Sequence, residues 1–451
     1  FVSAPYWDIE LVTGTSPSFS ATLVEVDGAK VATGKDFSST GTAKKSVVVV
    51  TEARARELAD ALHSAAFSVR SVEEKPYRSS PKAPFMTSTL QQEGGRKLRL
   101  GAAQVMRLAQ GLYERGYITY MRTDNVVLSE EALGAVRSEV SKAYGSKFLS
   151  PSPRQFSTKV KNAQEAHEAI RPTTPLRSPE ALSGELNGQE LSLYRMIWQR
   201  TLASQMADAA GTTVSVRLGA TASAAGNADC EFAASGTTIT FAGYRQVYVE
   251  SLDDSDDSDE REALLPPLAV GNPVKVESLT PNGHATTPPA RYTEASLVKK
   301  LEELGVGRPS TWASIIQTVQ DRGYVWKKGQ ALVPTWTAFA VVGLMEKHFD
   351  NLVDYAFTAR IEEDLDAIAR NELQKQDWLQ RFYFGDDDLK GLKPLVEENL
   401  DSIDAAEVNT FRIGTDPDGA DIVVKPGKYG PYVKRGDDTA SVPDEIGRAH
   451  V

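Results

Sequence analysis

The chain has 451 residues, a length that suits about three domains of ordinary size. Hydrophobic residues make up 41% of it and Cys230 is its single cysteine, so the composition excludes a wholly disordered chain, a disulfide scaffold and a cysteine-ligated zinc site. No apolar run approaches the ~18 residues of a membrane helix, so we expect no membrane-spanning helix and no membrane partner.

The formal net charge is −11, but the charge is distributed unevenly. Residues 253–262 carry seven acids and one arginine, and we interpret this run as a solvated loop. Residues 80–125 carry seven basic and three acidic residues. Because a phosphate backbone responds to the local field rather than to the total charge, this basic segment is a candidate for contact with nucleic acid.

Strand patterns fill residues 1–79, apart from a helical pattern over 52–65, and they return at 212–250. The residues between the two β-rich stretches read as mainly helical. This order predicts a discontinuous β-rich domain, 1–79 with 208–287, into which a helical domain over 80–207 is inserted. The overall class is therefore multidomain α+β.

Within the inserted region the spacing predicts a helix over 100–115 that ends at Gly116, and a second helix that begins after Ser129. Further helices are predicted over about 163–170 and 191–207.

Residues 288–404 predict a helical DNA-binding domain. Thr293 is placed to cap one helix that ends at Gly305, and a second helix begins near Trp312 and ends at Gly323. A hairpin rich in lysine follows. Two helices with a tight turn and a basic hairpin are typical of winged-helix modules.

Residues 405–451 predict a small β unit, with a turn at Asp416-Pro417-Asp418-Gly419. Tyr429 and Tyr432 lie beside basic residues there. Aromatic and basic side chains together suit single-stranded nucleic acid.

The stretch Gly116–Asp124 carries the clearest chemical signal. We expect it to be extended, which would place Tyr120, Arg122 and Asp124 on one face. A tyrosine is a weak nucleophile because its pKa is about 10, and a guanidinium beside it favours the phenolate and holds a phosphate oxygen. The alternative is a strand with a buried tyrosine and a surface ion pair.

Two further stretches carry candidate phosphate ligands. His167 and Arg171 would share one face of a helix that ends at Pro172. Arg308 and Thr311 stand at the start of the second helix of the winged-helix pattern, where backbone N–H groups favour a phosphate. Taken alone, each stretch is also compatible with a surface helix or a solvated turn.

Four stretches of the sequence form a larger pattern when taken together. They are APFMTSTLQQE, GYITYMRTD, QEAHEAIRPT and PPARYTEASLVKKLEELGVGRPSTWASIIQTVQDRGYV. In order and spacing they resemble the bacterial type IA DNA topoisomerases, in particular the topoisomerase I of actinobacteria. The resemblance covers nearly the whole chain.

The resemblance implies transient cleavage of one DNA strand, passage of the other strand and religation, which relaxes negatively supercoiled DNA without ATP. Tyr120 matches the nucleophile that forms a 5′-phosphotyrosyl link, and Arg122 matches the arginine that contacts the scissile phosphate. The matching DNA-contacting positions are His167, Arg171, Arg308, Thr311 and Arg322.

The sequence departs from the family pattern in its metal site. The family binds Mg²⁺ through an N-terminal Toprim domain with an Asp-x-Asp-x-Glu cluster. The nearest run here is Asp364-Leu365-Asp366, but Ile368 stands where the acid is required. We therefore expect a fragment without Toprim, with Mg²⁺ held outside this chain. Zinc ribbons are also absent, and residues 411–435 resemble the zinc-free C-terminal repeat of actinobacterial members.

Three alternatives remain open. Without a Toprim domain the fragment could bind single-stranded DNA and do nothing else. Topoisomerase III is a near relative, and a tyrosine recombinase or type IB enzyme would form a 3′-phosphotyrosine instead.

No G-x-x-x-x-G-K-[ST] motif for ATP occurs. We expect a cytoplasmic, nucleoid-associated monomer.

Overall fold

The computed structural model describes residues 1–157, 167–251, 265–386 and 390–442. They form two compact units. The first unit comprises Phe1–Lys82, Val140–Ser152 and Gln205–Ala290, and the second comprises Ala83–Glu139, Pro153–Ser204 and Arg291–Val451. The acidic run at 253–262 lies outside the described residues.

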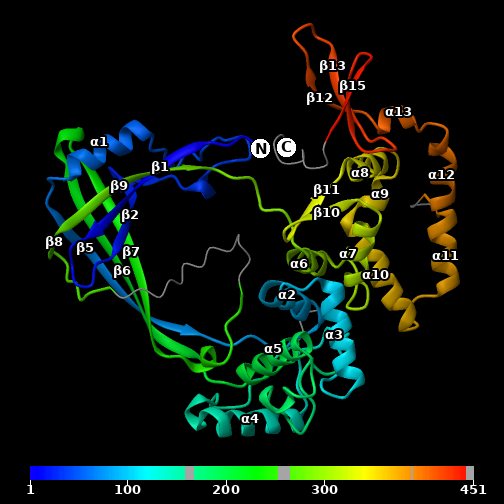
Figure 1. Ribbon diagram of the computed structural model, residues 1–451, viewed down its shortest axis with the longest axis horizontal. Coiled ribbons are helices and arrows are strands. Elements are labelled where there is room, and N and C mark those ends of the chain that lie inside the picture. Colours follow the sequence, from blue (N-terminus) through cyan, green and yellow to red (C-terminus); the bar gives the residue numbers. More distant parts are fainter. Residues whose placement is uncertain (158–166, 252–264, 387–389, 443–451) are drawn as a thin grey trace. The chain divides into compact units, whose positions relative to one another are not determined.

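The first unit is built on a large, mostly antiparallel sheet (Figure 1). Its strands are β1 (Pro5–Thr13), β2 (Ser20–Val26), β3 (Ala29–Val31), β4 (Val47–Val48), β5 (Phe67–Ser79), β6 (Ala209–Ala222), β7 (Ala228–Phe241), β8 (Pro273–Val274) and β9 (Val276–Ala285). Their spatial order is β4-β3-β2-β7-β6-β5-β8, and β1 pairs with both β2 and β9. Along β7 buried and less buried residues alternate from Ala228 to Ala234, as expected for a strand with one face in a core.

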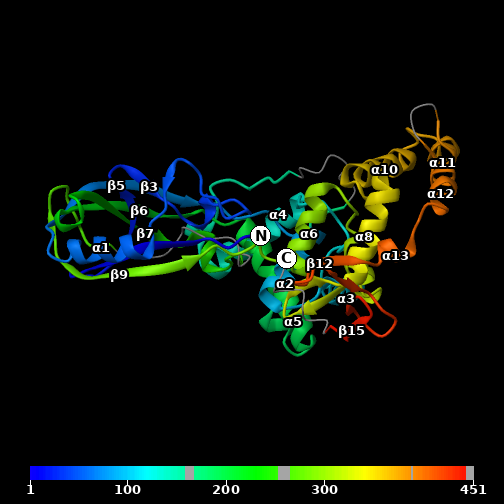
Figure 2. The ribbon, with the colours of Figure 1, turned by 90° about the horizontal axis from the view of Figure 1, so that it is seen from above.

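One helix, α1 (Glu52–Leu62), covers this core. The hydroxyl of Thr51 accepts the N–H of Arg54 at 3.3 Å and caps its first turn. Leu58 and Leu62 are fully buried and belong to the same hydrophobic cluster as Phe232 of β7. Figures 1 and 2 show α1 next to β9. The strand-rich character predicted for residues 1–79 is confirmed, and so is the helix within it, which ends at Leu62 rather than at residue 65.

Two strands that are far apart in sequence form one long antiparallel pair. The register of β5 with β6 runs from Ser68↔Gly219 to Ser79↔Ala209, although residues 80–208 separate the two strands. That intervening segment holds α2 (Thr87–Leu98), α3 (Ala102–Glu114), α4 (Glu130–Tyr144) and α5 (Gly188–Ser204). The β5–β6 pair is therefore the point at which helices interrupt the sheet. The domain boundaries proposed from the sequence stay a prediction.

The strand pattern predicted over 212–250 is wrong beyond Phe241, where β7 ends. A 3₁₀ turn occupies Gly243–Gln246 instead. Gly243 has φ +51°, and a Cβ there would lie 2.3 Å from the carbonyl oxygen of Asp208. Only glycine fits this close approach of two backbones, so the strand must end before it.

The elements that follow β9 belong to the second unit. They are α6 (Glu294–Leu304), α7 (Trp312–Asp321), β10 (Val325–Lys328), β11 (Ala331–Pro334), α8 (Trp336–His348), α9 (Asp350–Val353), α10 (Tyr355–Ala369), α11 (Lys375–Phe384), α12 (Leu392–Leu400) and α13 (Ala405–Val408). Thr293 caps α6 by accepting the N–H of Ser296 at 3.1 Å, and Gly305 ends the helix with φ +71°. The predicted helix–turn–helix and hairpin are confirmed.

A buried cluster ties these helices to α3. Val298 of α6, Trp312 and Ile316 of α7 and Ala102 of α3 are each no more than 4% exposed. The helix that leads into the Tyr120 segment therefore rests on the helix–turn–helix. Packing of apolar faces provides most of the stability of such short helices.

The C-terminal residues form a sheet from β12 (Phe411–Thr415), β13 (Asp421–Lys425), β14 (Tyr432–Arg435) and β15 (Asp438–Ser441), paired in this order. The carboxylate of Asp416 accepts the N–H groups of Asp418 and Ala420 at 2.9 and 2.8 Å, which closes the turn between β12 and β13. The predicted β unit is confirmed here, while residues 443–451 lie outside the described residues.

Candidate active site

The predicted nucleophile lies in the second unit, on the segment that follows α3. The extended strand expected over Gly116–Asp124 is wrong, because only Ile118 forms a bridge, with Pro172, and the chain bends around Tyr120. Its backbone groups bond to side chains and to short neighbouring segments rather than to a continuous ladder. A pattern rich in β-branched residues does not distinguish these two arrangements.

Tyr120 is held from both sides along the chain. On one side the N–H of Thr119 donates to the carbonyl of Arg171 at 2.9 Å. On the other side the buried Thr87 of α2 donates its hydroxyl to the carbonyl of Met121 at 2.8 Å and accepts the N–H of Thr123 at 2.9 Å. The backbone of the nucleophile is therefore fixed by the first residue of one helix and by an irregular segment.

The ring of Tyr120 lies between two other rings. Its centroid is 5.3 Å from that of Tyr113 on α3, at an interplanar angle of 70°, and 5.0 Å from that of His167, at 39°. Such aromatic contacts orient a ring without using its hydroxyl. Among the described residues the phenolic oxygen has no hydrogen-bond partner, and the side chain is partly exposed. The oxygen is thus available to a substrate.

Arg122 is exposed, and in the described part of the chain its guanidinium makes no ion pair or hydrogen bond. Asp124, in contrast, is only 8% exposed, so the three side chains expected on one face do not share it. A free guanidinium two residues from the nucleophile can grip two oxygens of a phosphate.

The helix predicted over 163–170 is wrong in its described part, and residues 158–166 lie outside the described residues. Residues 168–173 are irregular: Ile170 bridges to Phe85, and Pro172 bridges to Ile118. His167 is held through its carbonyl, which accepts the side-chain N–H of Asn125 at 2.6 Å. His167 therefore reaches Tyr120 from this irregular segment and not from a helix face.

Arg171 is engaged within the fold. It is 8% exposed, its Nε donates to the carboxylate of Glu168 at 2.5 Å, and its Nη1 donates to the carbonyl of Pro172 at 2.9 Å. Burial by itself would raise the pKa of Glu168, but the bond from Arg171 and bonds from Ser129 together lower it. The ion pair thus stabilises the segment that carries His167.

A partly buried contact that no local sequence pattern indicates joins α2 to α6. Ser88 of α2 donates its hydroxyl to the carboxylate of Glu302 on α6 at 2.8 Å. Burial raises the pKa of Glu302, and the negative charges of Glu303 and Asp124 add to this, while the Ser88 bond opposes it. The two partners are 214 positions apart, so no local pattern indicates the contact.

The three predicted DNA contacts at α7 do not form one site. Arg308 donates to Asp366 of α10 at 2.8 and 3.2 Å and to the carbonyl of Gly307 at 2.8 Å. Thr311 closes the same turn by accepting the N–H of Arg308 at 2.8 Å. Arg322 is exposed at the other end of this 10-residue helix, about 15 Å away at 1.5 Å per residue.

The C-terminal β unit presents one ring fully to solvent. Tyr429 is 95% exposed, and the ammonium of Lys428 lies 5.5 Å from its ring centroid. Tyr432, in β14, is only partly exposed. Tyr429 is therefore a free stacking surface beside a cation.

The described residues contain no group of three His, Cys, Asp or Glu side chains that could hold a metal ion. Asp364 and Asp366 lie on the helix α10, where Asp364 accepts the indole N–H of Trp378 and Asp366 pairs with Arg308. In the described part of the chain, no helix has both the length and the apolar character that crossing a membrane requires.

Comparison with known sequences places most of the chain in one family. Residues 1–380 match the model of the DNA topoisomerase family, and residues 415–448 match the topoisomerase C-terminal repeat. The DNA topoisomerase 1 of Mycolicibacterium smegmatis is 52% identical over 99% of this chain and 50% of its own length. That of Streptomyces coelicolor is 52% identical over 99% of this chain and 49% of its own length.

Comparison with solved structures agrees with the sequence comparison. The full-length topoisomerase I of Thermotoga maritima matches 98% of this chain and 67% of its own, with a TM-score of 0.69 and 27% identity. The chain spans about half the length of the two relatives above. The family model, the relatives and the fold lead to one statement: the chain belongs to the DNA topoisomerase family.

Proposed function

We propose that this chain is the strand-cleaving part of a type IA DNA topoisomerase I that relaxes negatively supercoiled DNA. The observation that carries the proposal is the arrangement of Tyr120. Its ring is held between Tyr113 and His167. Within the described residues its hydroxyl is free, and the guanidinium of Arg122, two positions away, has no partner.

The proposed reaction is a reversible transesterification. The oxygen of Tyr120 attacks a phosphodiester, a bond forms between that oxygen and phosphorus, and the bond from phosphorus to the 3′-oxygen breaks. The phenol loses its proton, and the leaving 3′-oxygen gains one. The protein keeps the 5′-phosphate, and attack of the 3′-hydroxyl reverses the step after the other strand has passed. The covalent link retains the energy of the phosphodiester, so the reaction needs no ATP.

Arg122 holds the scissile phosphate in this proposal, and charge stabilisation by a guanidinium is strongest where charge develops in the transition state. His167 packs on the nucleophile and donates to a phosphate when protonated. Arg171 acts through the fold, since its donors bond to Glu168 and to the Pro172 carbonyl. Arg322 contacts the DNA backbone from its exposed position, and Arg308 with Thr311 shapes the turn before α7 and contributes less.

Mg²⁺ supplies charge neutralisation at the cleavage site of such enzymes. The described residues offer no cluster that fits the ion. We therefore assign the binding of Mg²⁺ to a Toprim domain outside this chain. The single strand is the substrate, the protein acts as a monomer in the cytoplasm on the chromosome, and neither ATP nor zinc is required.

The test is complementation. The 451-residue chain and a separately expressed Toprim segment of a relative are mixed with an oligonucleotide that carries a label at the 5′ or the 3′ end. We expect covalent adduct only in the mixture with Mg²⁺, and only the label 3′ to the break should stay with the protein. DNA binding without adduct in any mixture would favour a purely binding fragment, and a retained 5′ label would indicate type IB chemistry.

A further inference from the structure

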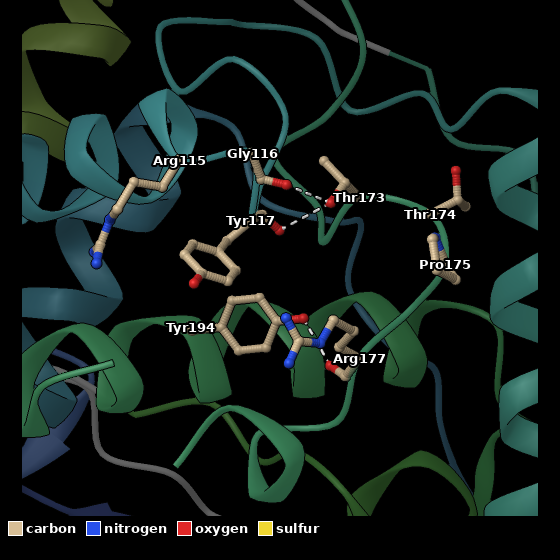
Figure 3. Close-up of a pocket in the computed structure, with 8 residues that line it drawn as sticks. All are labelled: Arg115, Gly116, Tyr117, Thr173, Thr174, Pro175, Arg177 and Tyr194. Atoms are coloured by element: carbon tan, nitrogen blue, oxygen red, sulfur yellow. Dashed lines mark hydrogen bonds between the residues drawn. The ribbon is translucent and has the colours of Figure 1, made fainter. Parts of the chain in front are cut away.

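The second unit holds a cavity of about 310 Å³ near the nucleophile (Figure 3). Its volume lies at the lower end of the range of ~300–1,000 Å³ found for ligand pockets, which suits one small group. Its lining includes Arg115, Tyr117, Thr173, Arg177 and Tyr194.

Two tyrosines form an aromatic wall of this cavity. The ring centroids of Tyr117 and Tyr194 are 6.5 Å apart at an interplanar angle of 77°, and Figure 3 shows the two rings one above the other, with Arg177 beside Tyr194. Tyr194 donates its hydroxyl to the carbonyl of Arg177 at 2.7 Å, and Tyr117 donates to Glu185 at 2.9 Å. Both rings are therefore held in fixed positions. Tyr194 is only 1% exposed and supports Tyr117 from behind, so the partly exposed ring of Tyr117 is the one that can stack on a ligand.

The cavity is polar but close to neutral in charge. Arg115 pairs with Glu190 at 2.5 Å, and Arg177 pairs with Glu185. Because each guanidinium has a carboxylate partner, the cavity favours a neutral polar group over a phosphate. Nη1 of Arg115 and Nε of Arg177 have no hydrogen-bond acceptor among the described residues, so both can donate to a carbonyl or ring nitrogen.

The same two backbone segments hold both the cavity and the nucleophile. The hydroxyl of Thr173 donates to the carbonyl of Gly116 at 2.6 Å, and its N–H donates to the carbonyl of Tyr117 at 3.1 Å. The same two segments hold Tyr120 through the bond from Thr119 to Arg171. Three residues span at most ~10 Å of extended chain, so a group in the cavity lies within a few nucleotides of a phosphate at Tyr120.

We propose that the cavity receives one nucleobase of the single strand that is bound at Tyr120. The base packs on Tyr117 and accepts a hydrogen bond from Arg115, and its occupancy sets the register of the strand relative to the nucleophile. This inference rests on the proposed function, because it assumes that a strand runs past Tyr120.

The test uses the 451-residue chain and single-stranded oligonucleotides in which one thymine at a time is replaced by 5-iodouracil. After irradiation, the protein is digested and the cross-linked peptides are identified by mass spectrometry. We expect cross-links to Tyr117, because Tyr194 is only 1% exposed. Binding that gives no cross-link to Tyr117 at any position would overturn the proposal.

Variants add a second readout. Loss of a stacked base weakens binding by about tenfold, so Tyr117→Leu should bind the oligonucleotide about tenfold more weakly, while Tyr117→Phe, which keeps the ring, should bind like the parent chain. Tyr355→Leu, at an exposed tyrosine of α10, is the control for loss of any surface ring. Equal losses for Tyr117→Leu and Tyr355→Leu, or displacement of the cross-link by inorganic phosphate alone, would overturn the base pocket.

The two proposals fail in different ways. Covalent adduct on Tyr120 in the complemented protein, without cross-links in the cavity, would overturn only the base pocket. Cross-links in the cavity, without adduct under any condition, would overturn only the cleavage function.

Discussion

The segment around Tyr120 and the turn before α7 both carry an arginine that the sequence marks as a DNA contact, yet their guanidinium groups differ. Arg122 is exposed and has no partner among the described residues, whereas Arg308 bonds to Asp366 and to the Gly307 carbonyl. Arg171, close to Tyr120, is bonded in the same way to Glu168. The motifs therefore mark two kinds of arginine: one whose guanidinium can bind a ligand, and one whose guanidinium stabilises the fold around the site.

The largest effect is expected at the nucleophile. Tyr120→Phe removes only the hydroxyl and keeps the ring contacts with Tyr113 and His167, so adduct should disappear in the complemented protein while DNA binding and unfolding stay unchanged. A denaturing gel measures the adduct. Tyr113→Phe is the matched control, since it removes the hydroxyl of the neighbouring ring and should still give adduct. Adduct from Tyr120→Phe at the parental level would refute the assignment.

The next effect concerns the arginine that builds the site. Arg171→Met leaves Glu168 with its bonds from Ser129 but without its charged partner. We expect about 2 kcal/mol less stability, below the ~3–5 of a fully buried pair because the Glu168 carboxylate is 31% exposed. Urea unfolding measures this. Arg122→Met, at an exposed arginine that has no partner in the described part of the chain, should change stability by at most ~0.5 kcal/mol. Equal destabilisation by the two variants would remove the distinction between the arginines.

The same pair predicts a dependence on pH. The folded state lowers the pKa of Glu168 below its usual 4.5, so the stabilisation is present above pH 4.5 and is lost as the pH falls through the folded value. The stability difference between the parent chain and Arg171→Met should therefore shrink below pH 4.5. A difference that grows in acid would show that the ion pair is not its cause.

A smaller effect is expected from Arg122→Lys. Lysine keeps the charge but loses the planar fork that holds two phosphate oxygens, and we expect cleavage or religation to slow about tenfold, a barrier increase of ~1.4 kcal/mol. Single-turnover cleavage in the complemented protein measures it. Unchanged rates would mean that Arg122 does not hold the scissile phosphate.

The smallest effect separates the two ends of α7. Arg322→Ala should reduce the slope of log affinity against log salt by about one unit, as expected for one lost phosphate contact. Arg308→Ala should reduce it by less, because Asp366 already holds that guanidinium. A fluorescent single strand titrated with salt gives both slopes. A full unit for Arg308→Ala would show that DNA displaces Asp366.

Several helices and turns could be predicted from local sequence signals such as caps and glycine stops. The cap at Thr293 and the stop at Gly305 bound α6 as predicted, and the turn at Asp416 closes as predicted. α2 was not predicted, although the Thr89 hydroxyl accepts the N–H of Met86 at 3.1 Å, a capping signal that its polar, weakly periodic sequence concealed. Local spacing specifies helices best where an apolar stripe and a cap coincide.

The candidate active site could be predicted from the sequence only in part. The motif identified Tyr120 and Arg122 as chemical groups, but their surroundings depend on contacts between distant segments: Thr87 with Met121, Ser88 with Glu302, and Ile118 with Pro172. These contacts replace the strand and the helix that local patterns suggested. The family resemblance identifies the site residues, but only the tertiary contacts show which guanidinium groups already have partners.

The most direct test of the central claim is the identity of the modified residue. Adduct from the complemented protein is denatured and digested with trypsin, which releases residues 116–122 as one peptide that contains both Tyr117 and Tyr120. Fragmentation of that peptide locates the nucleotide. We predict a 5′-phosphate joined to the oxygen of Tyr120. A nucleotide on Tyr117 or on any other residue, or one joined through its 3′-phosphate, would contradict the account.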